Sequence, residues 1–214
     1  MIRSDKWTAF GVVLLLAFSS VAHAEWVISA YGGHAITHDS DVDLSEPGFQ
    51  MLNFADVEWD AESFQSPPYY GVRLTHFLDC SPNWGIALDF SHAKAIASES
   101  QTVKVKGSRG GVPVNTTETI GTTFDELQFS HGHNIVTLNG IYRWFPKGER
   151  DDTFLGRMQP YVGLGIGAAI PHVEVITANN STSEYIVAGP TVQTMVGVNF
   201  DLIKHLSVFT EYKF

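Results

Sequence analysis

The chain has 214 residues and a formal net charge of −10 at pH 7. Nucleic-acid binding depends on basic contacts to phosphates, so this charge argues against a nucleic-acid partner. Only 17% of the residues are charged and 12% are aromatic, a composition that excludes disordered chains and coiled coils. The single cysteine, Cys80, cannot form an intramolecular disulfide.

Residues 1–24 have the three parts of a secretory signal peptide. Arg3 and Lys6 make a basic start, residues 7–21 are mostly apolar, and the small-x-small triplet 22–24 ends the segment. We therefore expect export, with residues 25–214 as the mature domain. No later window of about 20 residues is continuously apolar, so no membrane-spanning helix is expected.

The mature sequence alternates between large apolar side chains and small or polar ones, the period-2 pattern of β-strands. Residues 84–90 show it most clearly. One parity carries large apolar side chains: Trp84, Ile86, Leu88 and Phe90. The other parity carries small or polar residues: Gly85, Ala87 and Asp89. The segments around Val72 and Leu138 repeat this arrangement, which predicts strands with two different faces.

Seven such segments occur, at residues 25–35, 68–78, 84–93, 129–145, 159–171, 184–200 and 204–214. Short connections mostly alternate with long ones, as expected for periplasmic turns and for extracellular loops at residues 36–67 and 94–128. The pattern predicts an all-β fold, an antiparallel transmembrane β-barrel of the eight-stranded outer-membrane type. Single-chain bacterial barrels have an even number of strands. Seven segments therefore predict a C-terminal truncation that removes one strand.

The polar parity distinguishes a membrane barrel from a soluble one. It carries single charges, Arg73, Asp89 and Arg143, that are expected to pair inside a narrow interior. Aromatic residues gather near the segment ends, as in the two interfacial girdles of membrane barrels. A soluble lipocalin-like barrel with an interior ligand stays open as an alternative, although its apolar face would have to point inward.

Two further segments carry recognisable patterns. Residues 103–106 and 112–119 alternate around the turn sequence 108–111, which predicts a hairpin between the third and fourth segments. Glycines at 163, 165 and 167 have the wrong spacing for a dinucleotide-binding motif and no following helix. We therefore expect no nucleotide or flavin cofactor, and we expect these glycines on the interior face of a strand.

Six histidines fall at the expected extracellular end of the barrel: His34, His38, His92, His131, His133 and His172. His131 and His133 share the parity of Thr137, and His172 and Glu174 form a second same-face pair. Asp41 lies in a run of alternating aspartates. Neutral imidazoles and carboxylates bind divalent metals, so His131, His133 and Asp41 are candidate metal ligands. Solvated rim residues are the simpler alternative.

Several stretches together resemble the outer-membrane lipid A oxidases, and they cover nearly the whole mature chain. They are residues 40–42, 64–73, 88–94, 124–129, 159–167, 171–175, 184–190 and 209–214. The resemblance implies an eight-stranded barrel in the bacterial outer membrane. It also implies oxidation of the proximal glucosamine of lipid A by molecular oxygen, which yields 2-aminogluconate and hydrogen peroxide.

This chemistry requires a redox centre, because dioxygen reacts slowly with closed-shell substrates. Without a flavin motif, a divalent or redox metal held by histidine and carboxylate is the simplest hypothesis. We expect His92, His172 and Glu174 to be catalytic, and Arg73 and Lys94 to bind the substrate. The expected partners are lipopolysaccharide and outer-membrane lipids, with the protein a monomer. Two alternatives stay open: a non-enzymatic structural or adhesive barrel, and a lipid A hydrolase with paired Ser and His residues.

Overall fold

The computed structural model describes residues 13–16, 25–146, 148 and 150–214. Within these ranges the chain forms antiparallel β-sheets, and the only helical element is the 3-10 helix η1 (Ile120–Thr122). Among the described residues there is no helix that is long and apolar enough to span a membrane. The expected all-β, antiparallel fold class is confirmed. The expected signal peptide lies outside the described residues except for 13–16.

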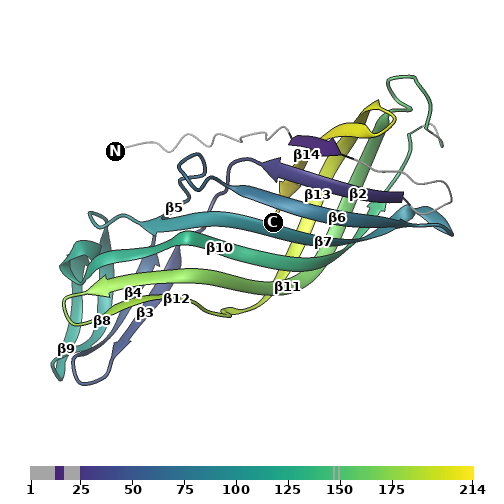
Figure 1. Cartoon of the computed structure of the whole chain (residues 1–214). Helices are drawn as coiled ribbons and strands as arrows, with labels where there is room; N and C mark the ends of the chain where they lie inside the picture. The colour runs from purple at the N-terminus through teal and green to yellow at the C-terminus, as the bar shows by residue number, and fades with distance from the viewer. Residues whose placement is uncertain (1–12, 17–24, 147, 149) are drawn as a thin grey trace.

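The larger sheet contains the long strands that the alternation predicts. Its strands are β1 (Val13–Leu16), β2 (Glu25–Gly32), β5 (Trp59–Asp60), β6 (Tyr70–Leu78), β7 (Ser81–Ala97), β10 (Phe124–Arg143), β11 (Met158–Thr177), β12 (Ser181–Tyr185), β13 (Gly189–Ile203) and β14 (Leu206–Lys213). The seven expected segments correspond to β2, β6, β7, β10, β11, β13 and β14. The structure extends β7, β10 and β11 well beyond the expected bounds (Figure 1).

The pairings of the larger sheet run in the order β10-β11-β13-β14-β1-β2-β6-β7, and β7 pairs in turn with β10. Strand β1 stands between β14 and β2, with Val13 opposite Phe209 and Leu16 opposite Ile28. Four residues from within the expected signal peptide thus occupy the place next to the last strand. The expected loss of a C-terminal strand stays a prediction.

The two faces of this sheet differ in the way the alternation predicts. On one face, which we call the enclosed face, Asp89, Thr137 and Asn139 are each 1% exposed. On the opposite, outer face, Leu88 and Leu138 are 54% and 57% exposed. Most large apolar side chains of these strands therefore point away from the buried interior, where a smaller cluster that includes Phe77, Ile141 and Phe209 is packed. This is the reverse of the usual arrangement in a soluble domain.

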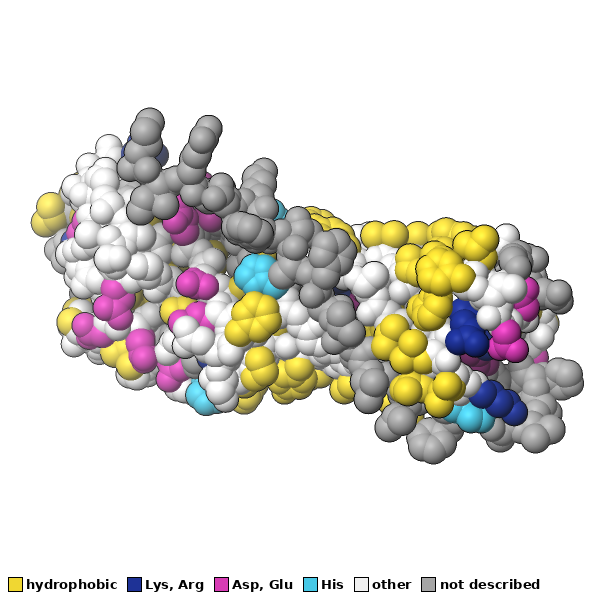
Figure 2. Space-filling view, turned by 90° about the horizontal axis from the view of Figure 1, so that it is seen from above, with side chains coloured by type: hydrophobic (Ala, Val, Ile, Leu, Met, Phe, Trp, Pro, Cys, Tyr) yellow, Lys and Arg dark blue, Asp and Glu magenta, His cyan; other side chains and the backbone are white. Residues whose placement is uncertain are grey.

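Cross-strand neighbours on the outer face form a continuous apolar row, which we call the apolar belt. In order of pairing it consists of Ile28, Leu74, Leu88, Leu138, Ile166 and Val192. All six side chains are at least 40% exposed. Figure 2 shows apolar side chains gathered over the half of the molecule built from the larger sheet, whereas most acidic side chains lie over the other half.

A second, four-stranded sheet occupies the other end of the molecule (Figure 1). Its strands, in the order of pairing, are β3 (Ser40–Glu46), β4 (Gln50–Val57), β8 (Thr102–Arg109) and β9 (Val112–Thr119). Strands β8 and β9 are the hairpin predicted from residues 103–119. Its turn residues, Gly110 and Gly111, have φ of 58° and 78°, the conformation that a two-residue hairpin turn requires and that glycine adopts without strain.

The second sheet packs on the extended ends of β7, β10 and β11. Phe54 of β4 is fully buried against Phe124 of β10, with ring centroids 4.9 Å apart, and the cluster continues to Ala97 of β7. The segments 36–67 and 94–128, expected as long loops, therefore contain paired strands with an apolar core of their own. This core holds the far ends of the long strands in place.

A substitution of Gly165 tests how tightly the enclosed face is packed. An added Cβ would lie 2.0 Å from Asn139 Oδ1 and 2.8 Å from the Leu138 carbonyl oxygen. We expect Gly165→Val to lower the free energy of unfolding by about 3 kcal/mol, because the backbone cannot move aside. Urea unfolding in detergent micelles measures this. The control Ile166→Val, on the outer face, should unfold like the unmodified chain; equal stability of the two variants would contradict the packing.

Candidate functional site

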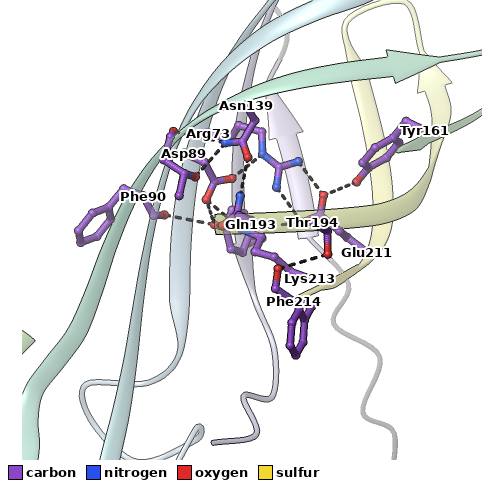
Figure 3. A network of polar contacts seen from close by, with 12 residues as sticks. Arg73, Asp89, Phe90, Asn139, Tyr161, Gln193, Thr194, Glu211, Lys213 and Phe214 are labelled. Carbon is purple, nitrogen blue, oxygen red and sulfur yellow. Dashed lines mark hydrogen bonds and ion pairs between the residues drawn. The ribbon is translucent and has the colours of Figure 1, made fainter. Parts of the chain in front are cut away.

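The enclosed face holds a network of paired charges (Figure 3). Arg73 on β6 donates from Nε to Asp89 at 2.5 Å and from both terminal nitrogens to Glu211 at 2.7 and 2.8 Å. Lys213 lies 2.9 Å from Asp89, and Tyr161 donates to Glu211 at 2.8 Å. Arg73 and Asp89 are the pair expected inside a narrow interior. The network joins β6 and β7 to β14 and fills the space between them.

A second group of charges lies on the same face toward the β13–β14 turn. Arg143 pairs with Glu25, stacks 3.4 Å from the centre of the Phe77 ring, and donates to Gln159 at 3.2 Å. Arg150 lies 2.9 Å from the other oxygen of Glu25. The buried Arg143 and the exposed Arg150 therefore share one carboxylate partner, Glu25.

Removing Arg73 from the first network should leave two buried carboxylates, Asp89 and Glu211, with Lys213 as the cation that remains between them. We expect Arg73→Met to lower the free energy of unfolding by about 3 to 5 kcal/mol, because Asp89 and Glu211 then repel each other in a buried setting. Urea unfolding in micelles checks the size of the loss. Lys104→Met on the exposed face of β8 is the matched control, and a loss no larger than in this control would contradict the role assigned to Arg73.

A β-bulge separates the two histidines of the His131-Gly132-His133 sequence. The register of β10 against β11 shifts between Gln128 and His133, and Gly132 has a φ of 103°. His133 lines a cavity on the enclosed face, together with Tyr31, Ser91 and Gln193. His131 instead lies on the outer face. The shared parity of these two imidazoles, expected from strict alternation, does not hold because the bulge resets the alternation.

His131 meets His172 and Glu174 on the outer face. One ligand atom from each of these residues lies within 4.8 Å of the others, and this is the single group of potential metal ligands among the described residues. The rings of His131 and His172 are 4.7 Å apart, and Tyr185 packs on the other side of His172 at 4.6 Å. His172 Nδ1 is buried without a hydrogen-bond partner among the described groups.

The His131–His172–Glu174 cluster is adjacent to a shallow hollow on the outer face, which we call the outer groove. It is lined by Tyr70, Phe90, His92, His131, Ile170 and Tyr185. His92 is 5% exposed, and Tyr70 stacks on its ring at 4.9 Å. The groove lies along the same strands as the apolar belt. On β7, His92 of the groove is four residues beyond Leu88 of the belt, and on β11, Ile170 of the groove is four residues beyond Ile166.

The remaining candidates from the sequence lie elsewhere. Arg73 is 4% exposed and occupied by two carboxylates, and Lys94 donates to the Ser66 carbonyl at 2.9 Å. Asp41 on β3 accepts from the Asp56 amide at 3.1 Å. The structure thus brings together His131, His172 and Glu174, places His92 in the neighbouring groove, and leaves His133, Asp41, Arg73 and Lys94 outside.

Two functional candidates carry little signal in the sequence. Asn134 contacts His92, with Oδ1 3.0 Å from Nδ1, and Tyr185 walls the groove beside His172. A glycine between two histidines in a strand is a sign of a bulge, and it is the one feature that hinted at the change of face. Tyr185 contacts His172 because β12 pairs with β11 and places the two residues opposite each other.

Comparison with models of protein families, with curated proteins and with solved structures found no match to this chain.

The geometry predicts which histidines bind a metal ion. Titration of the full chain in micelles with Fe²⁺ under anaerobic conditions should show one site, and His172→Ala should weaken it about tenfold or more. His133→Ala is the matched control, because His133 lines the cavity on the enclosed face, opposite the face that carries the His131–His172–Glu174 cluster. Calorimetry measures both affinities. Equal weakening by the two substitutions would contradict the site on the outer face.

Proposed function

We propose that the chain is an outer-membrane β-barrel enzyme that oxidises the proximal glucosamine of lipid A to 2-aminogluconate with molecular oxygen. The closed order of strand pairings and the exposed apolar belt support the barrel and its place in a membrane. An exposed apolar row across six neighbouring strands is costly in water and favourable against lipid.

The observation that carries the proposal is the position of the His131–His172–Glu174 cluster relative to the belt. Trp84 and Tyr142 pack together at one end of the belt, with ring centroids 4.9 Å apart, as residues of an interfacial girdle would. His92 lies eight residues further along β7, about 26 Å of strand and less when the strand is tilted. That length matches the apolar band of a membrane barrel, so the outer groove falls at the level of lipid headgroups.

The donor set fits the chemistry. Two imidazoles and one carboxylate are the ligands of non-haem iron(II) centres that use dioxygen, and the unpartnered Nδ1 of His172 fits such a role. A bound redox metal would supply the path for electrons from the sugar to oxygen. In the reaction, the C1 hemiacetal loses two electrons and two protons to dioxygen, giving a lactone and hydrogen peroxide. Water then opens the lactone to 2-aminogluconate.

The alternatives make different demands on the site. A structural or adhesive barrel requires no convergence of the histidines, whereas His131, His172 and Glu174 lie together. A lipid A hydrolase requires a Ser–His pair. Ser91 lines the enclosed cavity and the adjacent His92 lines the outer groove, so these two do not form one. The convergence therefore favours the oxidase.

Expression in a bacterial host whose lipid A has a free hydroxyl at C1 of the proximal glucosamine, and is not oxidised, tests the proposal. Mass spectrometry should show lipid A carrying one additional oxygen atom only when cells grow with oxygen. Membranes from cells grown without oxygen should form the same product on exposure to air, but not when a chelator is added before the air. His172→Ala should reduce conversion about a hundredfold or more, because the electron path is lost. His205→Ala, at the opposite end of the sheet, should convert normally. Unmodified lipid A in aerobic cells that contain the folded wild-type chain would refute the oxidase.

A further inference from the structure

His92 has a buried ring nitrogen whose role the metal cluster does not explain. The side chain is 5% exposed, and its Nε2 lacks a hydrogen-bond partner in the part of the chain that the structure describes. Tyr70 stacks on the ring with an interplanar angle of 23°, which holds the ring plane in place. Burying a polar atom without a partner costs free energy. A ligand group that forms a hydrogen bond with this nitrogen would remove that cost.

Asn134 determines which nitrogen of His92 carries the proton. Its Nδ2 donates to the carbonyl oxygens of Gly132 at 3.3 Å and Ile170 at 3.2 Å, so its Oδ1 faces His92 Nδ1 at 3.0 Å. The opposite amide orientation would set Oδ1 against two carbonyl oxygens and is disfavoured. An amide oxygen only accepts, so Nδ1 must be the protonated nitrogen. The lone pair of His92 is therefore on Nε2.

We propose that His92 Nε2 accepts a hydrogen bond from a sugar hydroxyl of a saccharide-headed membrane lipid, and that Asn134 is a positioning residue that keeps this lone pair available. This inference rests on the proposed function, because it takes the sugar headgroup of lipid A as the occupant of the outer groove. It adds a sugar-binding subsite next to the metal cluster, reached sideways from the membrane.

The surroundings of His92 suit such a lipid. Tyr70 and Tyr185, 42% and 61% exposed, give the groove aromatic walls with polar tips, as is usual at a membrane interface. Phe90 and Ile170 continue the groove toward Leu88 and Ile166 of the apolar belt, where acyl chains would lie. A headgroup and its acyl chains would therefore contact one continuous outer surface.

The tautomer and the binding can be measured without any turnover. Long-range ¹H–¹⁵N NMR of the full chain in phospholipid nanodiscs, with labelled histidine, should show His92 protonated on Nδ1. Adding lipid A to the nanodiscs should shift the His92 Nε2 resonance, whereas free glucosamine in solution should not. Protonation on Nε2, or no shift with lipid A, would overturn the inference, and an equal shift with free glucosamine would remove the lipid from it.

Variants separate positioning from a merely structural role. Asn134→Leu should populate the Nε2-protonated tautomer and raise KM for lipid A about tenfold, with a smaller change in kcat. Asn134→Gln keeps an amide, with an oxygen that can accept from Nδ1 and an NH2 group that can donate to the carbonyl oxygens, and should keep the wild-type tautomer and KM. His92→Phe keeps the stacked ring but loses the nitrogen, so KM should rise at least as much as in Asn134→Leu.

His76→Gln is the matched control, because His76 also has a buried unpartnered nitrogen but packs on Trp26, away from the groove. Its KM and the His92 resonances should not change. Identical behaviour of the Leu and Gln variants at Asn134 would overturn the positioning role. If the wild-type chain binds lipid A through His92 but does not oxidise it, the proposed function fails and the subsite stands.

Discussion

The pairing of buried charges around Arg73 is the constraint on which the rest of the structure depends. A charge inside a narrow protein interior is tolerated only when it is paired and hydrogen-bonded. Arg73 meets this requirement with Asp89 on the neighbouring strand and with Glu211, which is 138 residues away in the chain. Strands β6 and β14, which are far apart in the chain, must therefore reach a fixed register across the interior. Small residues such as Gly165 make the room that these bulky side chains occupy.

Polar groups occupy much of the enclosed face beside one apolar cluster that includes Phe77, Ile141 and Phe209. Most large apolar side chains of the same strands therefore lie on the outer face. The apolar belt is thus a consequence of the charge network as much as a feature in its own right. The extensions of β7, β10 and β11 beyond the belt carry a second apolar core under β4 and β8. This core packs the extended ends of the three long strands against β4 and β8, and so helps to position the side chains that these ends carry on the outer face.

The bulge at Gly132 decides which residues can act together. On the C-terminal side of the bulge, β10 alternates in register with β7 and β11, as the pairs Thr137–Asp89 and Thr137–Gly167 show. On its N-terminal side the alternation is shifted, so His131 lies on the same face as His172 and Glu174. The same bulge sets the Gly132 carbonyl beside Asn134, whose amide oxygen faces His92. One local change in backbone geometry therefore supports both the cluster and the groove.

The sequence by itself determined the long strands of the larger sheet, their two faces and the β8–β9 hairpin, whereas β3 and β4 lie in a segment expected as a loop. Period-2 alternation in β7 and β11 depends only on neighbouring residues, and so does the glycine turn of the β8–β9 hairpin. The same-face relation of His172 and Glu174 was readable for this reason. Which histidine joins them was decided by tertiary structure, because a bulge and a cross-strand partner are not local properties. Likewise, alternation placed Arg73 inside but could not reveal that two carboxylates occupy it, since Glu211 reaches it only when distant strands pack across the interior.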